Sequence, residues 1–145
     1  RGRRYVMSDI VWTFDVLADN FELAGSASQI TKSRLKQLGL STELIRKVII
    51  AMYEGEINMV IHANGGVATV TVKPEQIEVV LKDTGKGIED ISLALKEGYS
   101  TADSQIRELG FGAGMGLPNM KKYSDDMIID STVGVGTTIT MTFNL

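Results

Sequence analysis

The chain has 145 residues, of which 43% are hydrophobic and 23% charged, and its formal net charge at pH 7 is −3. This size and composition are typical of one globular domain with a real core, and the acidic balance argues against a general nucleic-acid-binding protein. The absence of cysteine excludes disulfides, thiolate metal sites and cysteine nucleophiles, and a single histidine excludes a multi-histidine metal site. No apolar run could cross a membrane and no signal-peptide pattern occurs, so we expect a cytoplasmic protein without a membrane partner.

The first predicted elements follow a basic, aperiodic start. We expect a tail over residues 1–7, whether native or left from cloning, and a single domain over residues 8–145. Residues 6–16 read as a strand, and apolar residues at helical spacing predict a helix over residues 18–38. A second helix, capped by Ser41 or Thr42, continues to about His62.

Strands dominate the second half of the chain, which also holds a long segment without periodicity. We predict, in chain order, a hairpin (67–72 with 76–81), a helical turn (88–97), a loop (98–116), a short helix (118–123) and a closing hairpin (127–131 with 137–143). A loop of this length in a compact domain is usually a functional lid. Grouped strands and helices indicate an α+β fold, with a mixed, mainly antiparallel sheet and helices on one face.

The most informative segment is the glycine run within that loop, LGFGAGMGLP at residues 109–118. Glycine permits close approach to the backbone, and Pro118 suits the first turn of a helix. The run therefore predicts a group of exposed backbone N–H groups at a helix N-terminus, which is a favourable place for phosphate.

Two further groups of residues point to chemistry. Glu54, Asn58 and His62 recur every fourth residue and share one helix face, although a solvated polar stripe has the same spacing. Asp83 ends a predicted strand and is followed by Gly85 and Gly87; its carboxylate could accept from the exocyclic amine of adenine, although Asp-x-Gly is also common turn chemistry. The P-loop, the dinucleotide fingerprint and the protein-kinase triplets are absent.

Taken together, these motifs resemble the three sequence boxes of the GHKL ATPases, which have the Bergerat fold. The resemblance is closest to the bacterial anti-sigma-factor serine/threonine kinases and related switch kinases. It covers nearly everything from Ile10 to Leu145 and rests on EGEINMVIHA (54–63), DTGKG (83–87), EGYST (97–101), GAGMGLPNMK (112–121) and STVGVGTT (131–138). It implies a two-layer α/β sandwich.

The resemblance also implies a role for each motif. Glu54 would be the general base, Asn58 would ligate Mg²⁺ beside ATP, and Asp83, helped by the hydroxyl of Thr138, would bind the adenine amine. Gly85 and Gly87 would border the base. The ATP lid, about residues 98–116, would hold the phosphates, and its implied contact residues, with the start of the next helix, are Ser100, Thr101, Arg107, Gly110, Gly112, Gly114, Met115, Gly116 and Leu117.

Some of these residues have a second interpretation. Arg107 could neutralise γ-phosphate charge or be an exposed loop arginine. Lys86 is read as a solvated turn lysine and His62 as a satisfied helix-end histidine. Residues 102–109 look inserted relative to the compact lid of the switch kinases.

The function implied is a kinase that uses ATP and Mg²⁺ to phosphorylate a serine or threonine of a STAS-domain protein of the anti-anti-sigma type. The alternatives are an ATP-binding anti-sigma or adaptor module that sequesters a partner, such as a sigma factor, and a stand-alone ATPase. The sequence leaves open whether the chain forms a homodimer.

Overall fold

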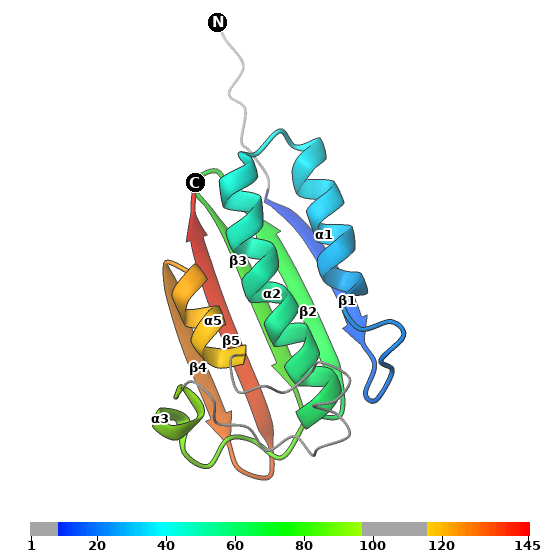
Figure 1. Ribbon diagram of the computed structural model, residues 1–145, viewed down its shortest axis with the longest axis vertical. Coiled ribbons are helices and arrows are strands. Elements are labelled where there is room, and N and C mark those ends of the chain that lie inside the picture. Colours follow the sequence, from blue (N-terminus) through cyan, green and yellow to red (C-terminus); the bar gives the residue numbers. More distant parts are fainter. Residues whose placement is uncertain (1–8, 97–115) are drawn as a thin grey trace, which may run out of the picture.

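The computed structural model describes residues 9–96 and 116–145 as two layers, a five-stranded sheet and helices that cover one of its faces (Figure 1). The strand order is β1-β2-β3-β5-β4, and every pairing is antiparallel. This confirms the predicted α+β class. The elements, in chain order, are β1 (Ile10–Val16), α1 (Ser26–Gln37), α2 (Thr42–His62), β2 (Gly66–Val72), β3 (Gln76–Asp83), α3 (Ile91–Ala94), α5 (Gly116–Tyr123), β4 (Asp126–Thr132) and β5 (Gly136–Asn144).

The register of the sheet builds the core in rows that run across the strands. Successive side chains of a strand point to opposite faces, so alternate residues form the face beneath the helices. One such row joins Trp12, Val70, Val79, Met141 and Met127 across all five strands, and the next joins Phe14 to Ile129 through Ala68, Leu81 and Ile139. These rows pack into the helical layer and form one hydrophobic core.

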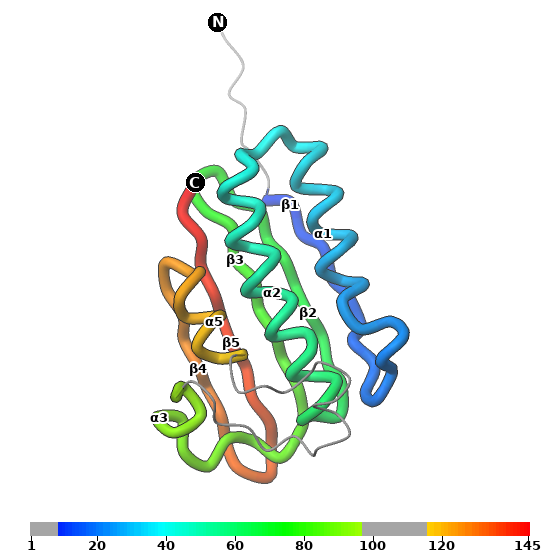
Figure 2. Tube along the Cα trace, viewed as in Figure 1, coloured from blue at the N-terminus to red at the C-terminus, as the bar shows by residue number. Residues whose placement is uncertain are grey.

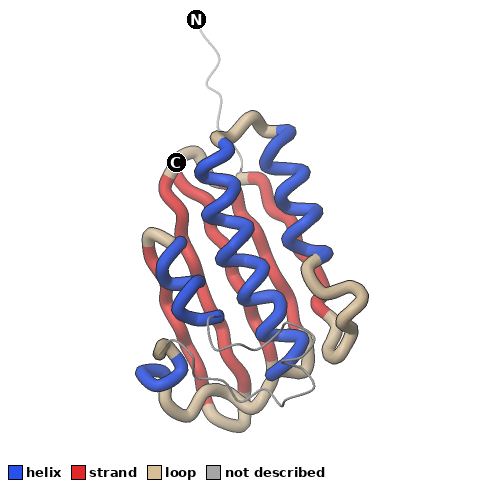
Figure 3. Tube along the Cα trace, in the orientation of Figure 1, coloured by secondary structure: helices blue, strands red, loops and turns tan. Residues whose placement is uncertain are grey.

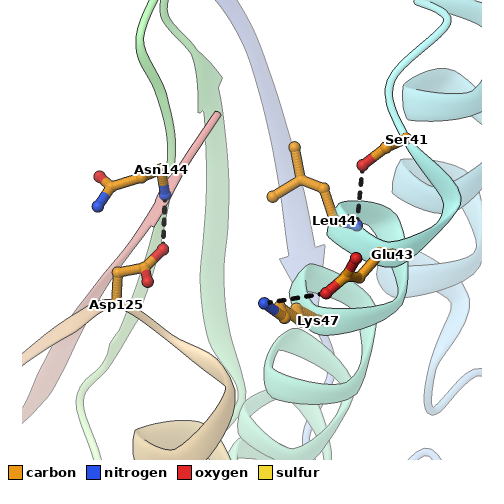
Figure 4. A network of polar contacts seen from close by, with 6 residues as sticks. All are labelled: Ser41, Glu43, Leu44, Lys47, Asp125 and Asn144. Carbon is orange, nitrogen blue, oxygen red and sulfur yellow. Dashed lines mark hydrogen bonds and ion pairs between the residues drawn. The ribbon is translucent and has the colours of Figure 1, made fainter.

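Helix α2 lies in the middle of the helical layer, between α1 and α5 (Figure 2). Its N-cap is Ser41, whose side chain accepts a hydrogen bond from Leu44 N at 3.2 Å, as the sequence predicted. Figure 4 shows this cap beside the i,i+4 ion pair of Lys47 and Glu43 on the first turns of α2. In the same region Asn144 N donates to Asp125 Oδ2 at 2.7 Å and holds the end of β5.

Helix α1 begins at Ser26, and the prediction of a helix from residue 18 is wrong for residues 18–25. Asp19 and Gly25 have φ angles of 55° and 92°, which are left-handed conformations that a helix does not contain. Gly25 is the N-cap and has no side chain with which to cap the helix. The capping group comes from α2 instead: the carboxylate of Glu56 accepts from Gly25 N, Ala27 N, Ser28 N and Ser28 Oγ at 2.8–3.2 Å.

The short helices α3 and α5 (Figure 3) also differ from their predicted bounds. Of the predicted segment 88–97, the structure describes residues 88–96, and within these only residues 91–94 form a helix, which Asp90 caps by accepting from Leu93 N. Helix α5 begins at Gly116, two residues before the predicted start. The predicted lid, apart from Gly116, lies outside the described residues. Within the described ranges, no helix combines the length and the apolar character that a membrane span requires.

Candidate nucleotide site

A cavity of about 430 Å³ opens at the end of the sheet where β3 finishes and β5 begins. Small-molecule sites commonly have this size and a largely apolar lining with a few polar groups. The walls come from the C-terminal half of α2, the turn after β3, helix α3, the first residues of α5, and β5. Polar side chains on this lining include Asn58, His62, Asp83, Lys86 and Thr137.

Asp83 is the polar end of the inner face of β3. Its Oδ1 accepts hydrogen bonds from Gly85 N at 2.9 Å and from Thr137 N at 3.2 Å. Among the described residues, its Oδ2 receives no hydrogen bond, so that oxygen is available to a donor in the cavity. The sequence prediction that Asp83 can accept from a ligand amine therefore fits this geometry.

The row of the sheet that contains Asp83 differs from the apolar rows described above, because its side chains on β3, β5 and β4 are polar. Antiparallel pairing places Asp83 opposite Thr137, and Thr137 opposite Ser131 of β4. Ser131 Oγ lies 2.7 Å from Thr137 Oγ1 and accepts from Ile88 N at 2.8 Å. The side chains at this end of the inner face are therefore fixed by hydrogen bonds instead of by apolar packing.

The threonine that lines the cavity is Thr137, and not the predicted Thr138. The structure pairs Thr138 with Lys82, whose neighbours Leu81 and Asp83 face the cavity, so Thr138 belongs to the opposite face of the sheet. The prediction for Thr138 is therefore wrong by one residue, and a shift of one residue reverses the face. The alternation of Thr137, Ile139, Met141 and Phe143, all buried, is the signal in the sequence that could have shown the correct register.

Asn58 lies on the cavity side of α2 and touches the start of α5. A Cβ added to Gly116 would lie 3.0 Å from Asn58 Oδ1 and 2.8 Å from Asn58 Nδ2. The absence of a Cβ at position 116 therefore lets the Asn58 amide pack closely against the start of α5. Leu117, the next residue of α5, is buried and also lines the cavity.

Glu54 lies one helical turn before Asn58, on the side of α2 that faces α5. It is half-buried and accepts from Asn119 Nδ2 at 3.4 Å, and it is not part of the cavity wall described above. The structure thus places Glu54 against α5 and Asn58 on the cavity wall, one helical turn apart on α2, which agrees with their predicted sharing of one helix face.

The turn after β3 carries the two predicted glycines. Gly87 lines the cavity with a φ of 80°, and a Cβ there would lie 2.6 Å from the carbonyl oxygen of Thr132. Gly85 is buried behind Asp83 and meets the end of α2 at Ala63 instead of the cavity. Gly87 therefore borders the cavity directly, and Gly85 shapes it through Asp83.

His62 lines the cavity at the end of α2. Its burial lowers the pKa of the imidazole below 6.5, and the positive charge of Lys86 lowers it further. His62 is therefore neutral at pH 7. Lys86, which was read as a solvated lysine, is exposed and also borders the cavity.

The apolar walls were not identified as site residues from the sequence. They include Met59, Leu81, Ile88, Leu93 and Ile139, which the register and the turn bring together. Seven further predicted contact residues lie outside the described part of the chain: Ser100, Thr101, Arg107, Gly110, Gly112, Gly114 and Met115.

The chain is thus an α+β domain in which helices cover one face of an antiparallel sheet, and an Asn and an Asp line one cavity at the end of that sheet. The family model described as "histidine kinase-like ATPase domain" matches residues 17–143. The chain belongs to this family, and the resemblance to the GHKL ATPases is confirmed.

Three curated relatives of this chain are anti-sigma F factors and a serine/threonine-protein kinase. An anti-sigma F factor of Thermoanaerobacter sp. (strain X514) is 32% identical over 111 residues, which cover 73% of this chain and 74% of the relative. The serine/threonine-protein kinase RsbT of Bacillus subtilis (strain 168) is 27% identical over 118 residues, which cover 79% of this chain and 83% of the relative. An anti-sigma F factor of Lysinibacillus sphaericus is 29% identical over 141 residues, which cover 93% of this chain and 91% of the relative.

A solved structure supports the fold. The crystal structure of the RsbU and RsbW domains of a Mycobacterium tuberculosis protein matches 97% of this chain with a TM-score of 0.61 and 16% sequence identity. The present chain spans 33% of that longer protein. At this identity the similarity shows the fold alone.

Proposed function

We propose that this chain is an ATP-dependent serine/threonine protein kinase of the anti-sigma or switch-kinase type, which phosphorylates a STAS-domain regulatory protein. The observation that carries the proposal is the convergence of Asn58, Asp83 and Gly116 on one cavity at the end of the sheet. These residues come from three separate motifs of the chain, and each faces the cavity with the chemistry that a nucleotide and its metal need.

The adenine end of the site is formed by Asp83 and Thr137. The free Oδ2 of Asp83 accepts the exocyclic amine, and the apolar walls at Met59, Leu81 and Ile139 cover the flat ring. Gly87 allows the backbone to pass close to the base, and Gly85 holds the Asp83 carboxylate in place. This arrangement explains why the motif needs one carboxylate and small residues after it.

The phosphate end lies between Asn58 and the start of α5. Mg²⁺ prefers oxygen ligands and keeps few protein ligands, and the amide oxygen of Asn58 on the cavity wall is a donor of that kind. Asn58 would hold the metal through Oδ1. The lid residues Ser100, Thr101, Arg107, Gly110, Gly112, Gly114 and Met115 are proposed, with Gly116 and Leu117, to hold the phosphates.

Glu54 is the proposed general base. When bound, Mg²⁺-ATP supplies the phosphoryl group and partial neutralisation of its charge. Glu54 takes the proton from the partner's serine or threonine hydroxyl as that oxygen forms its bond to the γ-phosphorus and ADP leaves. Phosphoryl transfer requires mainly positioning and charge stabilisation, so one carboxylate, one helical turn from Asn58, is sufficient.

The proposed partner class rests on the resemblance to the switch kinases, and relatives named anti-sigma F factor and serine/threonine-protein kinase RsbT support a regulatory partner. A phosphate added to a small regulatory protein brings about two negative charges and three acceptor oxygens, enough to break or create a protein complex. The names of the anti-sigma F factors also favour a second function, in which the ATP-bound chain sequesters a partner such as a sigma factor.

Substitution of Glu54 tests the proposal against this second function. Glu54→Gln keeps the size of the side chain and removes the base, so we expect unchanged ATP affinity and loss of phosphate transfer to a STAS-domain protein. The matched control is Glu43→Gln, an exposed glutamate on the first turn of the same helix. Transfer by Glu54→Gln at the wild-type rate would contradict the role of Glu54. An unphosphorylated partner that still binds the ATP-loaded chain would favour sequestration.

A further inference from the structure

Ser131 of β4 is the one member of the polar row that the proposed function leaves without a role. Its Oγ accepts from Ile88 N at 2.8 Å, lies 2.7 Å from Thr137 Oγ1, and lies 3.3 Å from the carbonyl oxygen of Gly136. A serine hydroxyl has a single proton to donate. The direction of the bond between the two hydroxyls therefore decides where the proton of Thr137 points.

The distances favour donation from Ser131 to Thr137. A separation of 2.7 Å is ordinary for a hydrogen bond between hydroxyl groups, whereas 3.3 Å is longer than that range. If Thr137 donated instead, the Ser131 proton would be left with the distant Gly136 carbonyl. With Ser131 as the donor, the Thr137 proton is free to turn into the cavity beside Asp83.

We propose that Ser131 is a positioning residue that sets base specificity: it fixes the Thr137 hydroxyl as a hydrogen-bond donor beside the Asp83 acceptor. An acceptor next to a donor complements a purine edge that has an amine next to an unprotonated ring nitrogen, which is the edge of adenine. Hypoxanthine and guanine present a carbonyl oxygen and an N–H at the same places, so the pattern is reversed. This inference rests on the proposed function of the cavity.

The test measures selectivity between bases, not activity. ADP and IDP differ only at this edge, and calorimetric dissociation constants for both are measured with the wild type, Ser131→Ala, Thr137→Val, the double variant and Ser131→Thr. Ser131→Ala also leaves Ile88 N without its acceptor, but a disturbed turn would weaken both nucleotides equally. Thr140→Val, on the outer face of the same strand, is the matched control for Thr137→Val.

We expect the wild type to prefer ADP and Ser131→Ala to lower the ratio of the two affinities about three- to tenfold, the effect of one neutral hydrogen bond. Ser131→Thr should restore the ratio, and Ser131→Ala should change nothing further in the Thr137→Val background. An unchanged ratio, or additive effects in the double variant, would overturn the role of Ser131 alone. A wild type that binds neither nucleotide would overturn the proposed function and this inference with it.

Discussion

A few polar side chains determine what the cavity can bind, because most of its wall is apolar. Asp83 is fixed by two backbone amides on one oxygen and offers the other to a ligand. Asn58 packs closely against the start of α5, where Gly116 has no Cβ. Each polar group thus has a defined orientation, which the recognition of a nucleotide and its metal requires.

Removal of the Asn58 amide should separate metal binding from base binding. We expect Asn58→Ala to abolish Mg²⁺-dependent ATP binding, because it removes the only proposed protein ligand of the metal. Asn144→Ala, an exposed asparagine at the end of β5, is the control (Figure 4). Calorimetry with and without Mg²⁺ measures the effect, and an Asn58→Ala variant with wild-type affinity in Mg²⁺ would remove Asn58 from the metal site.

The titration of His62 tests the description of the cavity directly. Burial and Lys86 place the pKa below 6.5, and the chain has one histidine, so a single imidazole signal in an NMR titration reports it. The unfolded chain then binds more protons than the folded one as the pH falls below 6.5, so folding stability decreases in that window and recovers as the pH rises. A midpoint at or above 6.5 would show that the imidazole is not buried as described.

At the scale of residues, the family resemblance named Asn58, Asp83, Gly87, Gly116 and Leu117 as ATP or metal contacts, and all five line the cavity. It could not decide between Thr137 and Thr138, because both carry a hydroxyl and only the register with β3 assigns a face. It also gave no indication of Ser131 as a partner of Thr137, since that contact depends on the pairing of two strands.

At the scale of elements, α2 is held on both of its sides. Glu56 ties it to the N-terminus of α1, and Asn58 and Glu54 contact α5. Residues 54 and 58 share one face of the helix, and residue 56 lies nearly opposite. The position of the cavity residues is therefore fixed by contacts on the two flanks of the same helix.

Loss of the Glu56 carboxylate should destabilise the fold. Glu56 is only 2% exposed and accepts four hydrogen bonds, so Glu56→Ala leaves several buried donors unpaired at the start of α1. We expect the free energy of unfolding to fall by about 3 kcal/mol. Urea denaturation measures it.

The control for Glu56→Ala is Glu43→Ala on the exposed first turn of α2, which should change stability by less than about 1 kcal/mol. Equal losses in the two variants would contradict the capping role of Glu56.

The same cap explains why the start of α1 was predicted too early. Phe21, Leu23 and Ala24 continue the helical spacing of apolar residues, but the chain turns at Gly25 and the helix begins only where Glu56 can cap it. A contact between residues 31 positions apart has no local signal in the sequence. The N-cap of α2, in contrast, is a local interaction, and Ser41 is one of the two residues, with Thr42, that the sequence predicted for it.

At the scale of the whole molecule, the sheet brings distant segments to one end. Asp83, Thr137 and Ser131 come from β3, β5 and β4, and the strand order places them side by side above the ends of α2 and α5. The grouping of strands and helices in the sequence predicted the α+β class and the single covered face. The order in which β5 inserts between β3 and β4 was not predicted, because it depends on long-range pairing.

The kinase function is tested most directly by the intact mass of a STAS-domain protein from the same genome after incubation with this chain and Mg²⁺-ATP. We expect one added phosphate on a serine or threonine of one such protein with the wild type, and none with Glu54→Gln. Confirmed ATP binding with no added phosphate on any STAS-domain protein would contradict the kinase assignment and favour the sequestering module.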